Sequence, residues 1–315
     1  MQKIYSRKYP SDFDNEIDLK KLFHLLWEGK WIVVSVTAFV SIAGVIYSLL
    51  LPNIYESRAL LVPVNSSSSI AGSLAGYSGL AGLAGISLPS GNSEGNSVEA
   101  IKKLSSLSFF ENNIMPNIYL PDLMAFKSWN SKTNKVVFDE SLFEVKTNSW
   151  IRNYSYPLQQ IPSAQESFAV FTSKHLTLSE DKKSGFITLS IKHQSPYIAK
   201  QWTELVVNEV NSFYRQKDKL NSEKAVNYLN QQILMTSLSE IKEVLAKLLQ
   251  EEVKKLTLIE ANQFYVFDYI DPPALMETRS EPNRALICFL SALLGGILSF
   301  LLVFLRHNVI SKKAS

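Results

Sequence analysis

Two long stretches rich in large apolar residues contain no charged residue, and they lie near the two ends of the chain. The first runs from Trp31 to Leu51 and the second from Ala285 to Leu305. A helix of this length measures about 31 Å at 1.5 Å per residue, close to the thickness of a bilayer's hydrocarbon core. A core helix of a soluble protein rarely runs this far without a polar face. The pattern therefore predicts transmembrane helices at 31–51 and 285–305.

The basic residues of the short ends predict how the chain crosses the membrane. Lys3, Arg7, Lys8, Lys20, Lys21 and Lys30 precede the first stretch, and Arg306, Lys312 and Lys313 follow the second. Short basic ends stay on the cytoplasmic side, so residues 1–30 and 306–315 are expected to be cytoplasmic tails and residues 52–284 a periplasmic domain. Pro52 follows the first stretch in place of a small-residue cleavage site, which favours an uncleaved anchor over a signal peptide.

Between the two spans, β-branched runs and helical periodicities alternate in a recognisable order. The predicted elements are a strand at Ile54–Val64, a helix capped by Ser97, strands at Phe168–Leu178 and Gly185–Lys192, a long helix from Pro196, and a strand at Phe264–Ile270. This is the β-α-β-β-α-β order of a ferredoxin-like fold. We therefore expect an α+β membrane protein in which two transmembrane helices flank a ferredoxin-like α/β base formed by residues 54–193 and 264–271. The first and last strands would bring both membrane connections to one side.

The segment 196–262 is too long to belong to the base alone. Pro196 suits a first helical position after a Ser195 N-cap, and as one rod the segment would reach about 99 Å. The run Ser237–Glu240 has the pattern of a capping box, which favours a projecting helical hairpin; a single rod is the alternative. Residues predicted to face inward on the second helix are Leu238, Ile241, Leu245, Leu248, Val253 and Leu256.

Narrow apolar stripes on the two long helices bury little within one chain, so packing against other copies is expected. The predicted oligomer contacts are Trp202, Val206, Val210 and Phe213.

Two further segments have an apolar content without a settled role. Residues 65–97 form a Gly, Ala and Ser tract with interspersed leucines, which either packs on the bilayer, a neighbouring subunit or a lipid-borne ligand, or is a disordered insertion. Residues 17–28 have the spacing of an amphipathic helix at the cytoplasmic surface. That helix either binds a partner or sets the depth of the first span.

Charge and reactive residues exclude several classes of function. The net charge is +3 in 315 residues and the basic residues cluster at the tails, so no nucleic-acid partner is expected. Cys288 is the only cysteine, which rules out an intramolecular disulfide. The four histidines fall in different segments, and no phosphate-binding loop, zinc-protease motif or serine-nucleophile elbow is present. We therefore predict no catalysis, no cofactor and no metal.

Four segments together form a recognisable pattern: IDLKKLFHLLWEGKW before the first span, PNIYESRALLVP after it, HQSPYIAKQWTELVVNEVNSFY at the long helix and YVFDYIDPPALMETRSEPNRALI before the second span. With these segments, the chain resembles the Wzz-type chain-length determinants, which are polysaccharide co-polymerases. The resemblance implies a ring of identical subunits in a bacterial inner membrane, with a bell-shaped periplasmic body. It implies that this ring sets how many repeat units a separate polymerase adds to a lipid-linked glycan, without catalysis by the ring itself.

The family's Pro-rich juxtamembrane segment maps to residues 272–284, where the matching positions are Pro272, Pro273, Pro282 and Arg284. Met276 and Arg279 stand where further prolines are usual, which puts a continuous polyproline segment in doubt. In the second span, the predicted helix contacts are the small residues Ser291, Ala292, Gly295 and Gly296. Glycines are also common in membrane helices for no such reason.

The preferred function is a non-catalytic oligomeric regulator of O-antigen-type lipopolysaccharide chain length. Its expected partners are other copies of the chain, membrane lipid, a separate polysaccharide polymerase and the lipid-linked glycan. The alternative is a capsule or exopolysaccharide co-polymerase or export component that works with a separate tyrosine kinase. A sensor is disfavoured because the ten residues after Leu305 leave no room for a signalling module.

Overall fold

The computed structural model describes residues 27, 29–64, 93–262 and 264–314, and it divides the chain into two compact units. The helix pair comprises Met1–Pro52 and Pro282–Ser315, and the α/β unit comprises Asn53–Glu281. The predicted amphipathic helix at 17–28 lies outside the described residues, apart from position 27, as does the tract at 65–92.

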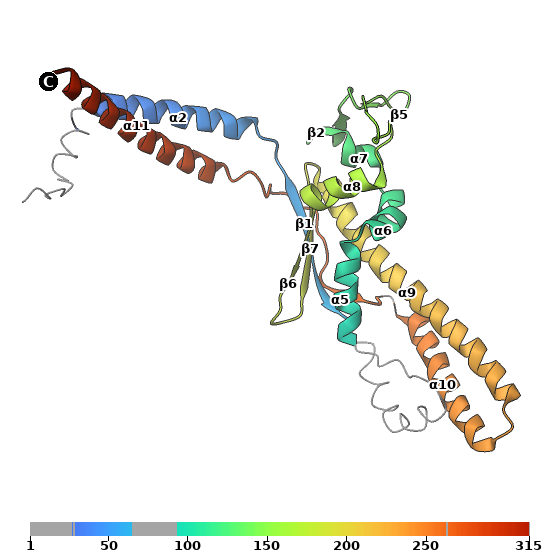
Figure 1. Ribbon diagram of the computed structural model, residues 1–315. Coiled ribbons are helices and arrows are strands. Elements are labelled where there is room, and N and C mark those ends of the chain that lie inside the picture. The colour runs from blue at the N-terminus through green and yellow to red at the C-terminus, as the bar shows by residue number, and fades with distance from the viewer. Residues whose placement is uncertain (1–26, 28, 65–92, 263, 315) are drawn as a thin grey trace, which may run out of the picture. The chain divides into compact units, whose positions relative to one another are not determined.

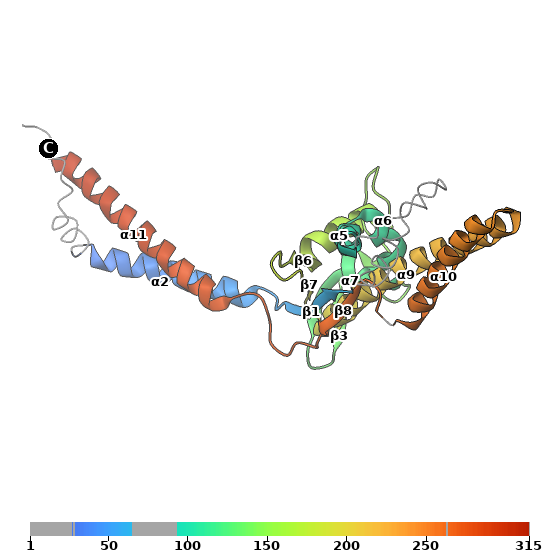
Figure 2. The ribbon, with the colours of Figure 1, turned by 90° about the horizontal axis from the view of Figure 1, so that it is seen from below.

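The helix pair consists of α2 (Lys30–Leu50) and α11 (Arg284–Ala314). The two helices lie side by side in both views (Figures 1 and 2). By length and composition, Lys30–Leu50 and Arg284–Arg306 are each apolar enough to cross a membrane. The helix α2 begins one residue before the predicted span, and α11 continues past Leu305 to Ala314.

A four-stranded antiparallel sheet forms the centre of the α/β unit. Its strands are β1 (Tyr55–Pro63), β6 (Leu176–Glu180), β7 (Ile187–His193) and β8 (Phe267–Asp271), in the order β6-β7-β1-β8. The register of β1 on β7 pairs Tyr55 with His193 and Leu61 with Ile187. Alternate residues of β1, including Ala59 and Leu61, are completely buried, as expected for a strand with one face on the core.

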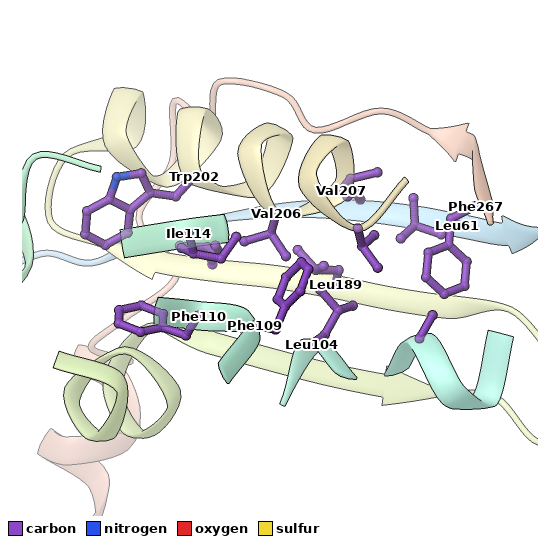
Figure 3. Packing of buried hydrophobic residues seen from close by; sticks show 14 of the residues in the cluster. Leu61, Leu104, Phe109, Phe110, Ile114, Leu189, Trp202, Val206, Val207 and Phe267 are labelled. Atoms are coloured by element: carbon purple, nitrogen blue, oxygen red, sulfur yellow. The ribbon is translucent and has the colours of Figure 1, made fainter. Parts of the chain in front are cut away.

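Helices supply the rest of the core. They are α5 (Ser93–Leu104), α6 (Leu107–Phe109), the π-helix η2 (Phe110–Ile114), the 3₁₀-helix η3 (Met115–Asn117) and the first half of α9 (Pro196–Met235). Figure 3 shows Trp202, Val206 and Val207 of α9 gathered with the strand residues Leu61 and Leu189. Phe109 and Phe110 complete the cluster from the helix that follows α5.

The α9 helix and α10 (Ser239–Ala261) form an antiparallel hairpin, side by side in Figures 1 and 2. Residues 196–262 therefore form a helical hairpin, as predicted, and not a single rod. The predicted capping box at Ser237 is also absent: Leu238 occupies the N-cap position of α10, with no side-chain cap bond. Leu245 is buried as predicted, whereas Leu238, Ile241 and Val253 are exposed.

The predicted strand at Phe168–Leu178 is mostly helical instead. The α8 helix (Ala164–Val170) continues into the π-helix η4 (Phe171–His175), and β6 begins at Leu176. The cause is a capping box, in which Glu166 N donates to Ser163 Oγ at 3.2 Å and Ser163 N donates to Glu166 Oε2 at 3.3 Å. This local start signal prevails over the β-branched composition that suggested a strand.

Two boundaries also differ from the prediction. The α5 helix begins at Ser93, before the predicted cap at Ser97, so the last residues of the 65–97 tract are helical. The last strand begins at Phe267 and not at Phe264.

Residues 119–162 form a lobe of short elements. These are α7 (Leu120–Met124), the hairpin of β2 (Phe126–Asn130) and β3 (Lys135–Phe138), and the hairpin of β4 (Phe143–Glu144) and β5 (Ser149–Trp150). The ring of Trp129 meets that of Tyr55 edge to face, with centroids 5.7 Å apart. The lobe is therefore attached where β1 begins.

Candidate functional site

The segment after β8 runs back along β1. Ser57 Oγ donates a hydrogen bond to the carbonyl of Ala274 at 3.1 Å. At the end of the segment, Ile54 N donates to Glu281 O at 2.9 Å, and Ser280 N donates to Ile54 O at 2.8 Å. The two connections to the helix pair thus leave the α/β unit from positions that are hydrogen-bonded to each other.

Charged side chains reinforce this junction, which we call the clamp (Ile54, Glu56, Lys192, Ser280 and Glu281). Lys192 Nζ lies 2.6 Å from Glu281 Oε1, and Ser280 Oγ donates to Glu56 Oε2 at 3.0 Å. The two hydrogen bonds from the Arg58 guanidinium, each 3.0 Å, are the main reason that the pKa of Glu56 falls from 4.5 to about 2. The hydrogen bond to Glu281 raises the pKa of Lys192. Both pKa shifts therefore favour the charged forms of the Glu56 and Lys192 side chains.

The predicted Pro-rich positions lie on either side of this clamp. Pro273 is buried and Pro272 is exposed, and residues 272–276 form neither helix nor strand. Pro282 and Arg284 belong to the helix pair, where Arg284 is the first residue of α11. The backbone of the segment is thus hydrogen-bonded to Ser57 of β1 and to Ile54, the residue before β1; neither residue belongs to the predicted site.

In the helix pair, the predicted small residues of α11 divide into two groups. A Cβ added to Gly295 would lie 3.0 Å from Thr37 Cα and 3.1 Å from Val40 Cβ, and one added to Gly44 would overlap the side chain of Ser291. A Cβ on Gly296 would meet no atom of the described residues within 4 Å. Ser291 and Gly295 therefore pack on α2 of the same chain, Gly296 lies outside this seam, and Ala292 is half-buried.

The predicted oligomer contacts of the long helix require correction. Trp202, Val206 and Val210 are at most 2% exposed, and all belong to the core beneath α9. Phe213 is half-buried against the same core and meets Phe109 edge to face at 5.8 Å. The stripe on the first half of α9 covers the chain's own sheet, which leaves Trp202, Val206 and Val210 no surface for another copy.

Pairing of β6 with β7 brings together two histidines that the sequence places in different segments. The rings of His175 and His193 stack with centroids 5.5 Å apart, and each meets Trp202 edge to face. Ser195 N donates to His193 Nδ1 at 3.0 Å, and burial lowers the pKa of His193 to about 3. This is a packed, neutral pair. No group of three or more His, Cys, Asp or Glu side chains within the described part of the chain is placed to hold a metal ion.

Asn211 is a second residue that the sequence did not single out. Its Oδ1 accepts hydrogen bonds from the backbone N–H groups of Val266 at 2.8 Å and Phe267 at 3.0 Å. Its Nδ2 donates to Phe267 O at 3.0 Å. Asn211 is 5% exposed and thereby fixes the point where the hairpin returns to the sheet. An asparagine among apolar residues of a helix is the only signal of this role in the sequence.

Comparisons with known proteins find one family model and several solved structures that are similar to this chain. Residues 15–112 match the family model described as "Wzz: Chain length determinant protein". No curated protein matches the chain. Among solved structures, a full-length bacterial polysaccharide co-polymerase is 16% identical, with a TM-score of 0.43 over 95% of this chain and 100% of that one. A fragment of WzzB, a polysaccharide co-polymerase from Salmonella Typhimurium, is 14% identical, with a TM-score of 0.31 over 73% of this chain and 100% of that one.

A third structure is a mutant of the Shigella flexneri lipopolysaccharide O-antigen chain-length regulator WzzBSF. It is 12% identical, with a TM-score of 0.25 over 72% of this chain and 100% of that one. All three TM-scores are below 0.5, so the likeness to the family rests on the matched segment. That segment contains the first apolar helix, β1 and α5. Through residues 15–112, the chain resembles the family of Wzz chain length determinant proteins.

Proposed function

We propose that the protein is a non-catalytic, oligomeric regulator of the chain length of a bacterial surface polysaccharide, of the O-antigen type, acting with a separate membrane polymerase. The observation that carries the proposal is the match of residues 15–112 to the chain length determinant family. The regulated reaction would be the polymerase's addition of repeat units to a lipid-linked glycan.

We further propose that α2 and α11 anchor the protein in the inner membrane with both ends cytoplasmic and the α/β unit in the periplasm. The length and apolar composition of both helices support this, as do the basic residues at the two ends of the sequence. The clamp supports it as well, because it lets both connections leave the α/β unit at one place. The order β6-β7-β1-β8, with α5 after β1 and α9 after β7, supports a ferredoxin-like classification of the base.

The hairpin supports assembly of identical subunits into a ring. Its outer half leaves several large apolar side chains exposed: Leu220, Tyr228, Leu234, Met235, Leu238, Val253 and Leu258. Leu234 at the tip is 85% exposed. Neighbouring hairpins packed side by side would bury this surface, whereas a single chain leaves it in water. These residues replace Trp202, Val206 and Val210 as the proposed subunit contacts.

A deletion strain tests the proposed function and separates its two versions. Surface polysaccharide from the wild-type and deletion strains is resolved by gel electrophoresis, and capsule is stained in parallel. The proposal expects polymer that persists with an altered or lost preferred length. Loss of capsule or of export with unchanged lipopolysaccharide would instead support the co-polymerase that works with a separate tyrosine kinase. Unaltered polysaccharide of every kind would refute both.

A further inference from the structure

The loop Ile151–Ile161 in the lobe presents apolar side chains to the outside. Tyr156 is 96% exposed and Ile161 is 59% exposed, and Ile151, Tyr154 and Leu158 are also exposed. Large apolar side chains grouped on one loop mark an interaction surface more often than scattered ones do.

Polar contacts beneath the loop fix it in this arrangement. The Arg152 guanidinium donates to both carboxylate oxygens of Glu166, at 2.7 and 2.8 Å, and to the carbonyls of Gln159 and Gln160. Gln160 Nε2 donates to Trp150 O at 2.6 Å. The Arg152 side chain is 11% exposed. The charged group is thus turned inward while the tyrosines point outward, so the exposure is a property of the folded loop.

The lobe lies at the end of the α/β unit from which both connections to the helix pair depart. Tyr55, which contacts Trp129 of the lobe, directly follows Ile54 of the clamp. Figure 1 shows α7, β2 and β5 gathered around the end of the sheet where β1 begins, whereas α10 extends beyond the other end.

Short tethers limit how far this end can be from the membrane. Three residues separate Ile54 from Leu50 at the end of α2, and two separate Glu281 from Arg284 at the start of α11. At about 3.5 Å per residue, the clamp can be no more than roughly 10–14 Å from the ends of the two helices. The headgroup layer on each side of the hydrocarbon core is about 5–8 Å thick. With α2 and α11 as membrane spans, tethers of this length keep the clamp within reach of the headgroups.

We propose that the loop Ile151–Ile161 docks into the headgroup region of the membrane leaflet from which the α/β unit emerges. Tyrosine suits this environment, because its ring contacts the acyl boundary while its hydroxyl stays hydrated. The inference rests on the proposed role of α2 and α11 as membrane spans. Docking gives each subunit a third attachment to the bilayer and fixes the orientation of its hairpin.

Site-specific fluorescence quenching in nanodiscs tests the docking with the full chain. In a Cys288→Ser background, a single fluorophore is attached at Tyr156→Cys or Ile161→Cys. Lys182→Cys, in the turn between β6 and β7, is the control for water, since it is exposed and lies outside the proposed subunit contacts. Leu301→Cys in α11 is the control for lipid, since its side chain is exposed in the isolated chain. Iodide reports contact with water, and lipids that carry a nitroxide at shallow or deep positions report contact with the bilayer.

The proposal expects labels at 156 and 161 to be quenched by shallow nitroxide lipids and several-fold less by iodide than the label at 182. Equal iodide quenching at 156, 161 and 182, with lipid quenching at 301, overturns the docking while the spans stand. A label at 301 that lipid does not quench removes the spans and the docking together. Protection of 156 and 161 from both quenchers means that another copy of the chain covers the loop, which also overturns the proposal.

Discussion

Asn211 on α9 and Phe267 on β8 are joined by two hydrogen bonds of 3.0 Å, one from the backbone N–H of Phe267 and one to its carbonyl. β8 is an edge strand of the sheet, and the Asn211 side chain pairs with the backbone groups at its start that have no neighbouring strand. Through β8, this contact fixes the path of the chain from the hairpin to the clamp and so to α11.

Replacing Asn211 with alanine is expected to destabilise the protein by about 2–4 kcal/mol, because it leaves backbone groups of Val266 and Phe267 buried without partners. For a domain of this size, that loss corresponds to a fall in Tm of roughly 5–15 °C. Thermal unfolding of the detergent-extracted chain measures it. Asn208→Ala on the same helix is the control, since Asn208 is exposed. Equal melting of the two variants would contradict the assigned role.

Glu56 gives the clamp a defined pH dependence. Its pKa in the folded protein is about 2, below the ordinary value of 4.5, so its contribution to stability is present above pH 4.5 and lost as the pH falls from 4.5 to 2. Glu56→Gln should lower the Tm at neutral pH and flatten the decline of Tm across that window. Glu277→Gln, an exposed residue of the same segment, is the control and should follow the wild type. A Glu56→Gln variant with the wild-type decline would show that the clamp does not depend on this carboxylate.

The seam between α2 and α11 predicts different outcomes for two adjacent glycines. Gly295→Leu places side-chain atoms against Thr37 and Val40, which we expect to cost about 1–3 kcal/mol and to separate the helices. Gly296→Leu should be tolerated. Distances between spin labels at Val34→Cys and Leu298→Cys, in a Cys288→Ser background, report the separation. Equal distances in both leucine variants would mean that the seam is not closely packed.

Assembly through the hairpin predicts a mass well above that of one chain. In nanodiscs, the protein should have a mass that is a multiple of 35.5 kDa after correction for lipid and scaffold. Serine at both Leu234 and Leu238 should shift the distribution to smaller assemblies, because it removes the apolar surface at the tip. Glu240→Ser, an exposed residue beside it, serves as control. A single chain per nanodisc for the wild type would exclude the ring.

Local sequence patterns predicted the helices and strands of this protein well, but they predicted the contacts between segments poorly. Charge-free length placed both apolar helices within a residue or two of α2 and of the start of α11. The strand expected from Phe168 failed because a local capping box at Ser163 outweighed composition. The assignment of Trp202 to a subunit contact failed because a helical stripe looks the same whether it covers the chain's own sheet or another copy.

The remaining contacts depend on pairings between distant segments. His175 and His193 meet only once β6 pairs with β7, and Lys192 reaches Glu281 only because the segment after β8 folds back on β1. Spacing along the chain contains no information about such pairs. Short periodic patterns therefore predicted most helices and strands. The contacts of the clamp and of the histidine pair could be found only from the three-dimensional pairing of distant segments.

The central claim is that this chain sets polysaccharide length without making the polymer. The most direct measurement is the length distribution of the polymer in a deletion strain, as the protein is re-expressed in steps while the polymerase is held constant. The account predicts that polymer is made throughout and that a preferred length returns as the protein level rises. A distribution that never changes, or polymer that appears only when this protein is present, would contradict it.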